Sequence, residues 1–185
     1  MVRISWFRVL LLGALAALGT GCASIKMVDT QSTKVVPAGK VVVTFIRQSI
    51  WMGDGIPVDL WDGTHYIGVL GPGTIVQYET MPGDHLFLAH AENWTYASGS
   101  LLEGKRYYLK ANIFPGAMTA RAAFGVAERT DTRIDEWHKW HAKAAPEAAR
   151  AAFEVKGLAK ANEAIELFKG GGVETFAAIL DAHAF

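Results

Sequence analysis

The chain has 185 residues, of which 51% are hydrophobic and 19% are charged, and its 18 basic and 18 acidic side chains give a formal net charge of zero. This length predicts one domain, or one domain with an appendage, and the hydrophobic content excludes a disordered chain. The balanced charge, without a basic cluster, argues against nucleic-acid binding, which needs a concentrated Lys/Arg surface. A single cysteine excludes an internal disulfide and a multi-cysteine metal site.

The first 21 residues have the features of an export signal. Arg3 and Arg8 form a basic region, and residues 9–18 are an apolar run of ten. A membrane-spanning helix needs roughly 20 apolar residues, so this run fits the core of a secretory signal peptide instead. Small residues follow it and lead to Cys22. Residues 1–21 are therefore predicted to be a signal peptide.

The sequence Leu18-Gly19-Thr20-Gly21-Cys22-Ala23-Ser24 resembles the lipobox of bacterial lipoproteins. In that family the peptidase cuts directly before the cysteine, which then carries a diacylglycerol on its sulfur and usually an acyl chain on its amino group. The resemblance implies lipidation of Cys22. Because Ala23 is not an aspartate, it also implies a location at the outer membrane, facing the periplasm. Gly19 departs from the pattern, since a large aliphatic residue is usual there.

An ordinary signal peptide with a chance cysteine is the alternative. Lipidation, however, gives the lone cysteine of an exported chain a use, where an unpaired thiol would be a liability. Two or three acyl chains anchor a protein firmly, whereas one alone binds only marginally. Cleavage would remove Arg3 and Arg8 and leave 16 basic and 18 acidic side chains, a formal charge of −2.

Residues 22–39 are predicted to be the lipidated cysteine and a polar tether. Fully extended, residues 23–39 reach at most about 55–60 Å. A short first strand is expected at 34–36, where two valines follow a lysine.

Residues 40–130 alternate between short β segments and turn signals. Asp62-Gly63 is a strong hairpin signal, and the continuous β-branched run that starts at Val41 predicts a buried central strand. The short connections contain no long helix, which argues against a parallel sheet. The chain is therefore predicted to be mainly β, an antiparallel β-sandwich of about seven strands followed by a C-terminal α-helical tail. The expected strands are 41–46, 58–61, 65–70, 74–79, 85–90, 106–113 and 119–128.

Several short motifs in this region also resemble a family. They are Phe45-Ile46-Arg47, Pro57-Val58-Asp59-Leu60, Tyr66-Ile67-Gly68-Val69-Leu70, Gly73-Thr74, Pro82-Gly83-Asp84-His85 and Gly104-Lys105-Arg106-Tyr107-Tyr108-Leu109. Their order and spacing are similar to those of an uncharacterised family of small bacterial lipoprotein domains, a domain of unknown function. The resemblance covers residues 40–114 and implies an immunoglobulin- or transthyretin-like sandwich. It brings no catalytic residues with it.

Residues 131–185 change to helical periodicity. Helices are expected around 132–141, from Pro146 to Lys169, and around 176–183. The middle helix is expected to bury one stripe of side chains. That stripe consists of Ala152, Val155, Leu158, Ile165 and Phe168. Two interpretations remain open, because the helices can pack against the sandwich or dock a partner.

Few residues suggest chemistry. His138 and His141 lie three apart on an expected helix, but two ligands do not make a metal site, so no metal and no cofactor are predicted. His85 and His90 are expected on opposite faces of one strand. Asp54, Asp59 and Asp62 are close in sequence, and a hydrolase that uses two of these three carboxylates is a minor alternative.

Aromatic residues in or beside loops are the main indication of a binding surface. Their faces suit stacking on sugar rings or anchoring of a protein partner, whereas packing at the edges of the core is the plainer interpretation. These residues, expected to point outward, are Trp51, Trp61, Tyr66, Trp94 and Tyr96.

The leading prediction is a non-catalytic envelope protein, anchored by a lipid on Cys22 and facing the periplasm. It acts as a binding or scaffold module, with the membrane and an envelope protein or glycan as partners. A glycan- or peptidoglycan-binding module and, less favoured, an envelope hydrolase are the alternatives. The leading prediction names no catalytic residues. Only the envelope-hydrolase alternative would use them, in the region of Asp54, Asp59 and Asp62.

Overall fold

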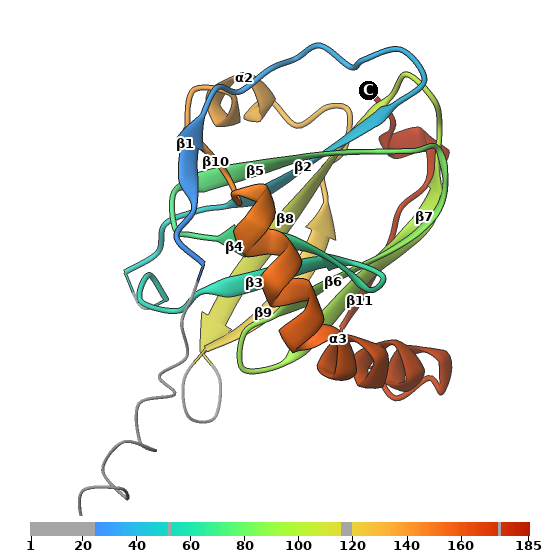
Figure 1. Cartoon of the computed structure of the whole chain (residues 1–185). Helices are drawn as coiled ribbons and strands as arrows, with labels where there is room; N and C mark the ends of the chain where they lie inside the picture. Colours follow the sequence, from blue (N-terminus) through green and yellow to red (C-terminus); the bar gives the residue numbers. More distant parts are fainter. Residues whose placement is uncertain (1–24, 52, 116–119, 174) are drawn as a thin grey trace, which may run out of the picture.

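The computed structural model describes residues 25–51, 53–115, 120–173 and 175–185. Two sheets lie face to face, as Figure 1 shows. One sheet has six strands in the order β1-β10-β5-β2-β8-β9, and the other has five in the order β11-β7-β6-β3-β4. The mainly β, sandwich-like prediction is confirmed. The predicted strand number is wrong, because the residues that the structure describes form 11 strands rather than about seven.

The strands are β1 (Val28–Thr30), β2 (Val41–Arg47), β3 (Val58–Asp62), β4 (His65–Leu70), β5 (Thr74–Thr80), β6 (Gly83–His90), β7 (Trp94–Leu101), β8 (Arg106–Pro115), β9 (Ala120–Val126), β10 (His141–Ala144) and β11 (Phe176–Ala178). The helices are α2 (Ile134–Trp137), α3 (Glu147–Lys169) and a 3-10 helix at Asp181–His183.

Strand β2 forms the centre of the fold, as its sequence predicts. All seven of its residues are buried. It pairs with β5 on one side and with β8 on the other. Its side chains alternate, so Val43 and Phe45 face the core between the sheets while Ile46 faces outward into a smaller cluster. Phe45 meets Phe87 of the opposite sheet edge-to-face, with ring centroids 5.4 Å apart.

The predicted antiparallel arrangement is only partly correct, because both sheets are mixed. Strand β2 runs parallel to β8, and two strands from the C-terminal region also pair in parallel, β10 with β5 and β11 with β7. Strand β1 pairs with β10, so the first strand lies at Val28–Thr30 and not at 34–36. The hairpin predicted at Asp62-Gly63 is present between β3 and β4.

In its described residues, the expected helical tail contains one long helix, α3, and no second one. Helix α2 has a single turn, His141 already belongs to β10, and the helix expected around 176–183 is replaced by β11 and the 3-10 helix. These short strands form because each finds the backbone of a strand far away in sequence, a partner that local periodicity cannot reveal.

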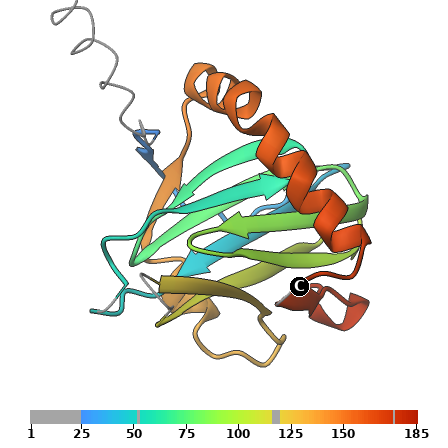
Figure 2. The same ribbon diagram turned by 90° about the horizontal axis from the view of Figure 1, so that it is seen from below.

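Helix α3 lies over the outer face of the five-stranded sheet, where Figure 2 shows it in orange above the green strands. The residues that it turns toward the sheet are Phe153, Gly157, Ala161, Ala164, Ile165 and Phe168. The predicted stripe is therefore correct for Ile165 and Phe168. It is wrong for Ala152, which is exposed, and for Val155 and Leu158, which are 80% and 40% exposed. Within the described residues, no helix combines the length and the apolar character needed to cross a membrane.

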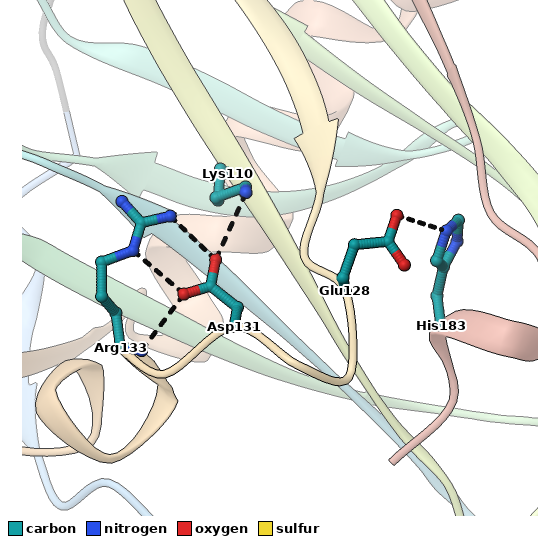
Figure 3. Close-up of polar contacts among 5 residues, drawn as sticks. All are labelled: Lys110, Glu128, Asp131, Arg133 and His183. Atoms are coloured by element: carbon teal, nitrogen blue, oxygen red, sulfur yellow. Dashed lines mark hydrogen bonds and ion pairs between the residues drawn. The ribbon is translucent and has the colours of Figure 1, made fainter.

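A polar cluster fastens the segment that follows β9 (Figure 3). The Asp131 carboxylate accepts hydrogen bonds from the Arg133 side chain at 3.0 and 2.8 Å, and Lys110 Nζ lies 3.5 Å away. Hydrogen bonding to Arg133 lowers the pKa of Asp131 to about 2. Glu128 Oε1 lies 3.4 Å from His183 Nε2, so the same loop also contacts the C-terminal 3-10 helix.

Candidate ligand-binding cavity beside helix α3

The five aromatic residues predicted to point outward occupy three different environments. Trp51 is 95% exposed on a loop and Trp94 is half-buried, whereas Trp61, Tyr66 and Tyr96 are buried. The predicted alternation of inward and outward side chains is correct for these three residues, because they lie on the outer face of their sheet. Their expected exposure is wrong, because α3 covers that face.

A cavity of about 440 Å³ lies where α3 leaves part of this face uncovered. The register of three strands builds its floor, since Asp59 of β3 stands opposite His90 of β6, and His90 stands opposite Trp94 of β7. Residues paired in this way have neighbouring side chains on one face of a sheet. The opposite wall is formed by α3, which contributes Phe153, Lys156, Gly157 and Lys160.

Tyr66 holds the Asp59 carboxylate in place at the cavity. Its hydroxyl donates a hydrogen bond to Asp59 Oδ1 at 2.8 Å. The Tyr66 ring is itself fixed between Trp61, edge-to-face at 4.8 Å, and Phe153 of α3, stacked at 5.4 Å. Glu154 of α3 accepts a hydrogen bond from the Tyr66 amide at 3.0 Å. The carboxylate is therefore positioned by packing as well as by hydrogen bonding.

Burial shifts the titration of both ionisable groups on the cavity floor. It raises the pKa of Asp59, and the Tyr66 hydrogen bond together with the nearby charges of His90 and Lys160 opposes part of that rise. Burial lowers the pKa of His90, an effect that Asp59 opposes and Lys160 reinforces. Perturbed ionisable groups that line a cavity are typical of functional sites, although structural groups show them too.

The two residues next to Trp94 in the chain, Asn93 and Thr95, fix its backbone by hydrogen bonds to β9. The Asn93 side chain accepts a hydrogen bond from the Ala122 amide at 2.8 Å and donates one to the Ala122 carbonyl at 2.9 Å. Thr95 Oγ1 accepts a third from the Phe124 amide at 3.0 Å. These bonds join the start of β7 to β9, so the Trp94 indole between them projects from a fixed backbone, 4.5 Å from the His90 ring.

A second hollow lies on the other side of Trp94. Its volume is about 460 Å³, and Trp94 lines both it and the first cavity. Glu92, Arg121 and Leu167 are among the residues around it. Because Leu167 belongs to α3, the same helix borders both spaces, with Trp94 between them.

The three carboxylates considered for hydrolysis do not meet. Asp54 caps its own loop by accepting hydrogen bonds from Ser49 Oγ and the Ile50 amide. Asp62 is on the inner face of β3, where His85 Nδ1 lies 2.8 Å from its Oδ2. Asp59 lies on the outer face. His85 and His90 are likewise on opposite faces of β6, as predicted.

His138 and His141, expected three apart on one helix, do not share a helix in the structure. His138 follows α2, and its ring nitrogens lie 2.7 Å from Ser32 Oγ and 2.8 Å from the Tyr108 hydroxyl, while His141 is in β10. In the part of the chain that the structure describes, no group of three or more His, Cys, Asp or Glu residues could hold a metal ion.

Sequence reasoning missed three ionisable residues of the cavity as site residues, His90, Lys156 and Lys160, and also the apolar lining residues Pro57, Phe153 and Gly157. Strand alternation could have placed His90 beside Asp59, but only with the register of β3 and β6. The two lysines looked like ordinary surface residues of a helix. Cys22, the predicted lipidation site, lies outside the described residues.

Comparisons with models of protein families, with curated proteins and with solved structures found no match to this chain.

Proposed function

We propose that the protein is a lipid-anchored binding module of the bacterial envelope that faces the periplasm, and that the cavity over Asp59 is its ligand site. The observation that carries the proposal is the placement of a half-buried tryptophan, Trp94, next to a half-buried and hydrogen-bonded carboxylate, Asp59, in a cavity of about 440 Å³. Concave sites with aromatic walls and few fixed polar groups are typical of small-molecule binding. The lipobox and the resemblance to small lipoprotein domains support the location.

The chemistry of the lining favours a glycan. The indole face of Trp94 offers an apolar platform with a polar N–H edge, which suits a sugar ring. The Asp59 carboxylate is an acceptor for hydroxyl or amide donors. Lys156 and Lys160 place two positive charges on the α3 wall, which suits the carboxylates that peptidoglycan carries.

Binding to purified peptidoglycan sacculi tests this proposal. The wild-type protein is expected to sediment with sacculi, and Trp94→Ala and Asp59→Asn are expected to weaken sedimentation about tenfold, the effect of losing roughly 1.4 kcal/mol of binding energy. Trp51→Ala is the matched control, because Trp51 is an exposed tryptophan that does not line the cavity. Absence of binding, or equal binding by all variants, would contradict the proposal.

An envelope hydrolase is the second candidate, favoured by the raised pKa of Asp59 and by His90 on the paired strand. A carboxyl group that stays protonated longer than usual can donate a proton to a leaving group. The same sacculi distinguish the two functions. Release of soluble fragments by the wild type, and none by Asp59→Asn, would support hydrolysis over binding alone.

The anchor makes a separate prediction. Mass spectrometry of the mature protein is expected to show an N-terminus at Cys22 with attached acyl chains. Cys22→Ala is expected to move the protein from the membrane fraction to the soluble fraction, because a lipobox without cysteine has no thiol to lipidate. An unmodified Cys22, or a retained Met1, would contradict the anchor but would leave the cavity proposal in place.

A further inference from the structure

The described chain begins in close contact with the body of the domain. Ile25 is only 7% exposed and packs in the cluster that contains Trp61 and Val69. Met27 follows it into the same surroundings, with its sulfur 3.3 Å from the Val69 amide nitrogen. Only residues 23 and 24 separate Ile25 from Cys22, a span of at most about 11 Å. A lipid on Cys22 would therefore hold the domain close to the membrane. The tether is then much shorter than the one that the sequence predicted up to residue 39.

Helix α3 begins in the same cluster as Ile25. Ala145, just before the helix, and Ala149 in its first turn both pack there. Figure 2 shows the start of the described chain, in blue, on the side of the molecule where α3 lies. The first half of α3 is thus the part of the helix that a lipid on Cys22 would bring nearest to the bilayer.

The outward side of α3 changes character along its length. In the first half Val155 is 80% exposed and Leu158 is 40% exposed. Ala151, Ala152 and Ala159 are exposed beside them. In the second half the exposed residues at equivalent positions, 11 residues further along, are the polar residues Asn162, Glu166 and Lys169. Leu167 is also exposed there, but it lies off this stripe and lines the second hollow. The stripe that contains Val155 and Leu158 therefore turns polar along the helix, and packing within the domain does not explain its apolar start.

We propose that the first half of α3 is the surface on which the anchored domain rests on the lipid bilayer. This inference depends on the proposed lipid anchor at Cys22. Val155 and Leu158 enter the boundary between headgroups and acyl chains, with the exposed alanines Ala151, Ala152 and Ala159 beside them. The apolar surface is too small to bind a membrane alone, so it orients a domain that the lipid already holds. The Asp59 cavity, on the flank of the same helix, then opens along the membrane surface.

Fluorescence of a polarity-sensitive label on the lipidated, full-length mature protein tests this inference. Lipidation blocks the thiol of Cys22, so a cysteine introduced by Val155→Cys is the only labelling site. Asn162→Cys is the matched control, since it is an exposed position on the same helix in its polar half. Both proteins are placed in vesicles of phosphatidylethanolamine and phosphatidylglycerol, and lipidation is verified by mass spectrometry.

The label at position 155 is expected to emit at shorter wavelength than the label at 162, and spin-labelled lipid is expected to quench it several-fold more strongly. Equal, water-like emission at both positions in verified lipidated protein would overturn the inference while the anchor stands. A mature protein without acyl chains on Cys22 would overturn the anchor and this inference together. Binding to sacculi remains a separate measurement in either case.

Discussion

Two partly buried histidines give the fold opposite dependences on pH. His138 lies between Ser32 and Tyr108, and burial, with the charges of Arg106 and Lys34, lowers its pKa to about 4. His85 is different. Burial alone would lower its pKa, but the Asp62 carboxylate and the Met81 carbonyl, on its two ring nitrogens, raise the pKa overall.

The His138 environment predicts sensitivity to acid. The unfolded chain takes up a proton near pH 6.5 and the folded chain only near pH 4, so the free energy of unfolding is expected to fall as the pH drops from about 6.5 to 4. His138→Gln keeps a hydrogen-bonding side chain that does not titrate, and it is expected to flatten this dependence. Urea unfolding of both proteins at pH 7, 5.5 and 4.5 measures it, and equal slopes would contradict the assignment.

Because His85 also titrates, the effect of His138 must be measured as the difference between the wild type and His138→Gln. Its raised pKa means that its stabilising effect is fully present below pH 6.5 and is lost as the pH rises through the folded-state pKa. The pH profile of the wild-type protein therefore contains opposing contributions from its histidines, His85 against His138 and His90. The difference between wild type and His138→Gln removes the His85 and His90 contributions, because both proteins retain them.

At the scale of elements, the close approach of α3 to the sheet depends on one glycine. A Cβ atom on Gly157 would lie 2.5 Å from two ring atoms of Trp61. The sequence alone showed only a residue that weakens a helix by about 1 kcal/mol relative to alanine. The structure supplies its reason, since the missing side chain lets the helix backbone rest on the indole.

Gly157→Ala is therefore expected to destabilise the protein by about 1–3 kcal/mol, despite the better helix propensity of alanine, because the added methyl group overpacks the contact. Trp61→Phe removes the outer ring of the indole. In that background Gly157→Ala is expected to be less destabilising. Chemical unfolding of the four proteins gives the coupling energy directly. A stabilising Gly157→Ala in both backgrounds would show that helix propensity dominates.

The elements that the sequence predicted well are those with strong local signals. The run that begins at Val41 gave a central strand, and Pro146 with the glycines after Lys169 gave the extent of α3 almost to the residue. Strand β7 was missed because alanine, serine and glycine follow its aromatic start, and its conformation depends on pairing with β6 and β11. The side of α3 that faces the sheet was predicted only in its second half, because in the first half glycine, not the large apolar residues, makes the closest contact.

The cavity shows the same limit. Alternation along β3 correctly separated Asp59 and Trp61 from Val58 and Leu60. Predicting that Asp59 would be half-buried required knowing that a helix from the far end of the chain covers this face. No local pattern carries that information, because it resides in contacts between residues about a hundred positions apart.

At the scale of the whole molecule, the C-terminal region is part of the fold. It contributes β10, which lies between β1 and β5, and β11, which extends the other sheet beside β7. It also supplies α3, which covers Trp61, Tyr66 and Tyr96. The two interpretations left open by the sequence are therefore not exclusive, since one side of α3 packs on the sandwich and the other remains exposed.

Truncation after Asp131 is expected to abolish cooperative unfolding, because it removes two strands and exposes three large aromatic side chains at once. Thermal unfolding followed by circular dichroism measures this. The point variant Val155→Ser, which alters only the exposed side of α3, is the control and is expected to keep the wild-type melting temperature. A truncated chain that melts cooperatively at the wild-type temperature would contradict the integration of the tail.

If the chain is exported as proposed, the pairing of β1 with β10 has a consequence for the order of folding and lipidation. Asp29 and Lys143, whose side chains lie 2.6 Å apart, are separated by 114 positions in the chain. Contacts so distant in sequence form late, after their loop has been closed. When the chain crosses the membrane with its amino terminus first, the proposed lipid site at Cys22 reaches the periplasmic side early. The residues of β10 and α3 cross later. We therefore expect acylation to precede folding, so that the sandwich closes while its first residues are already attached to the membrane.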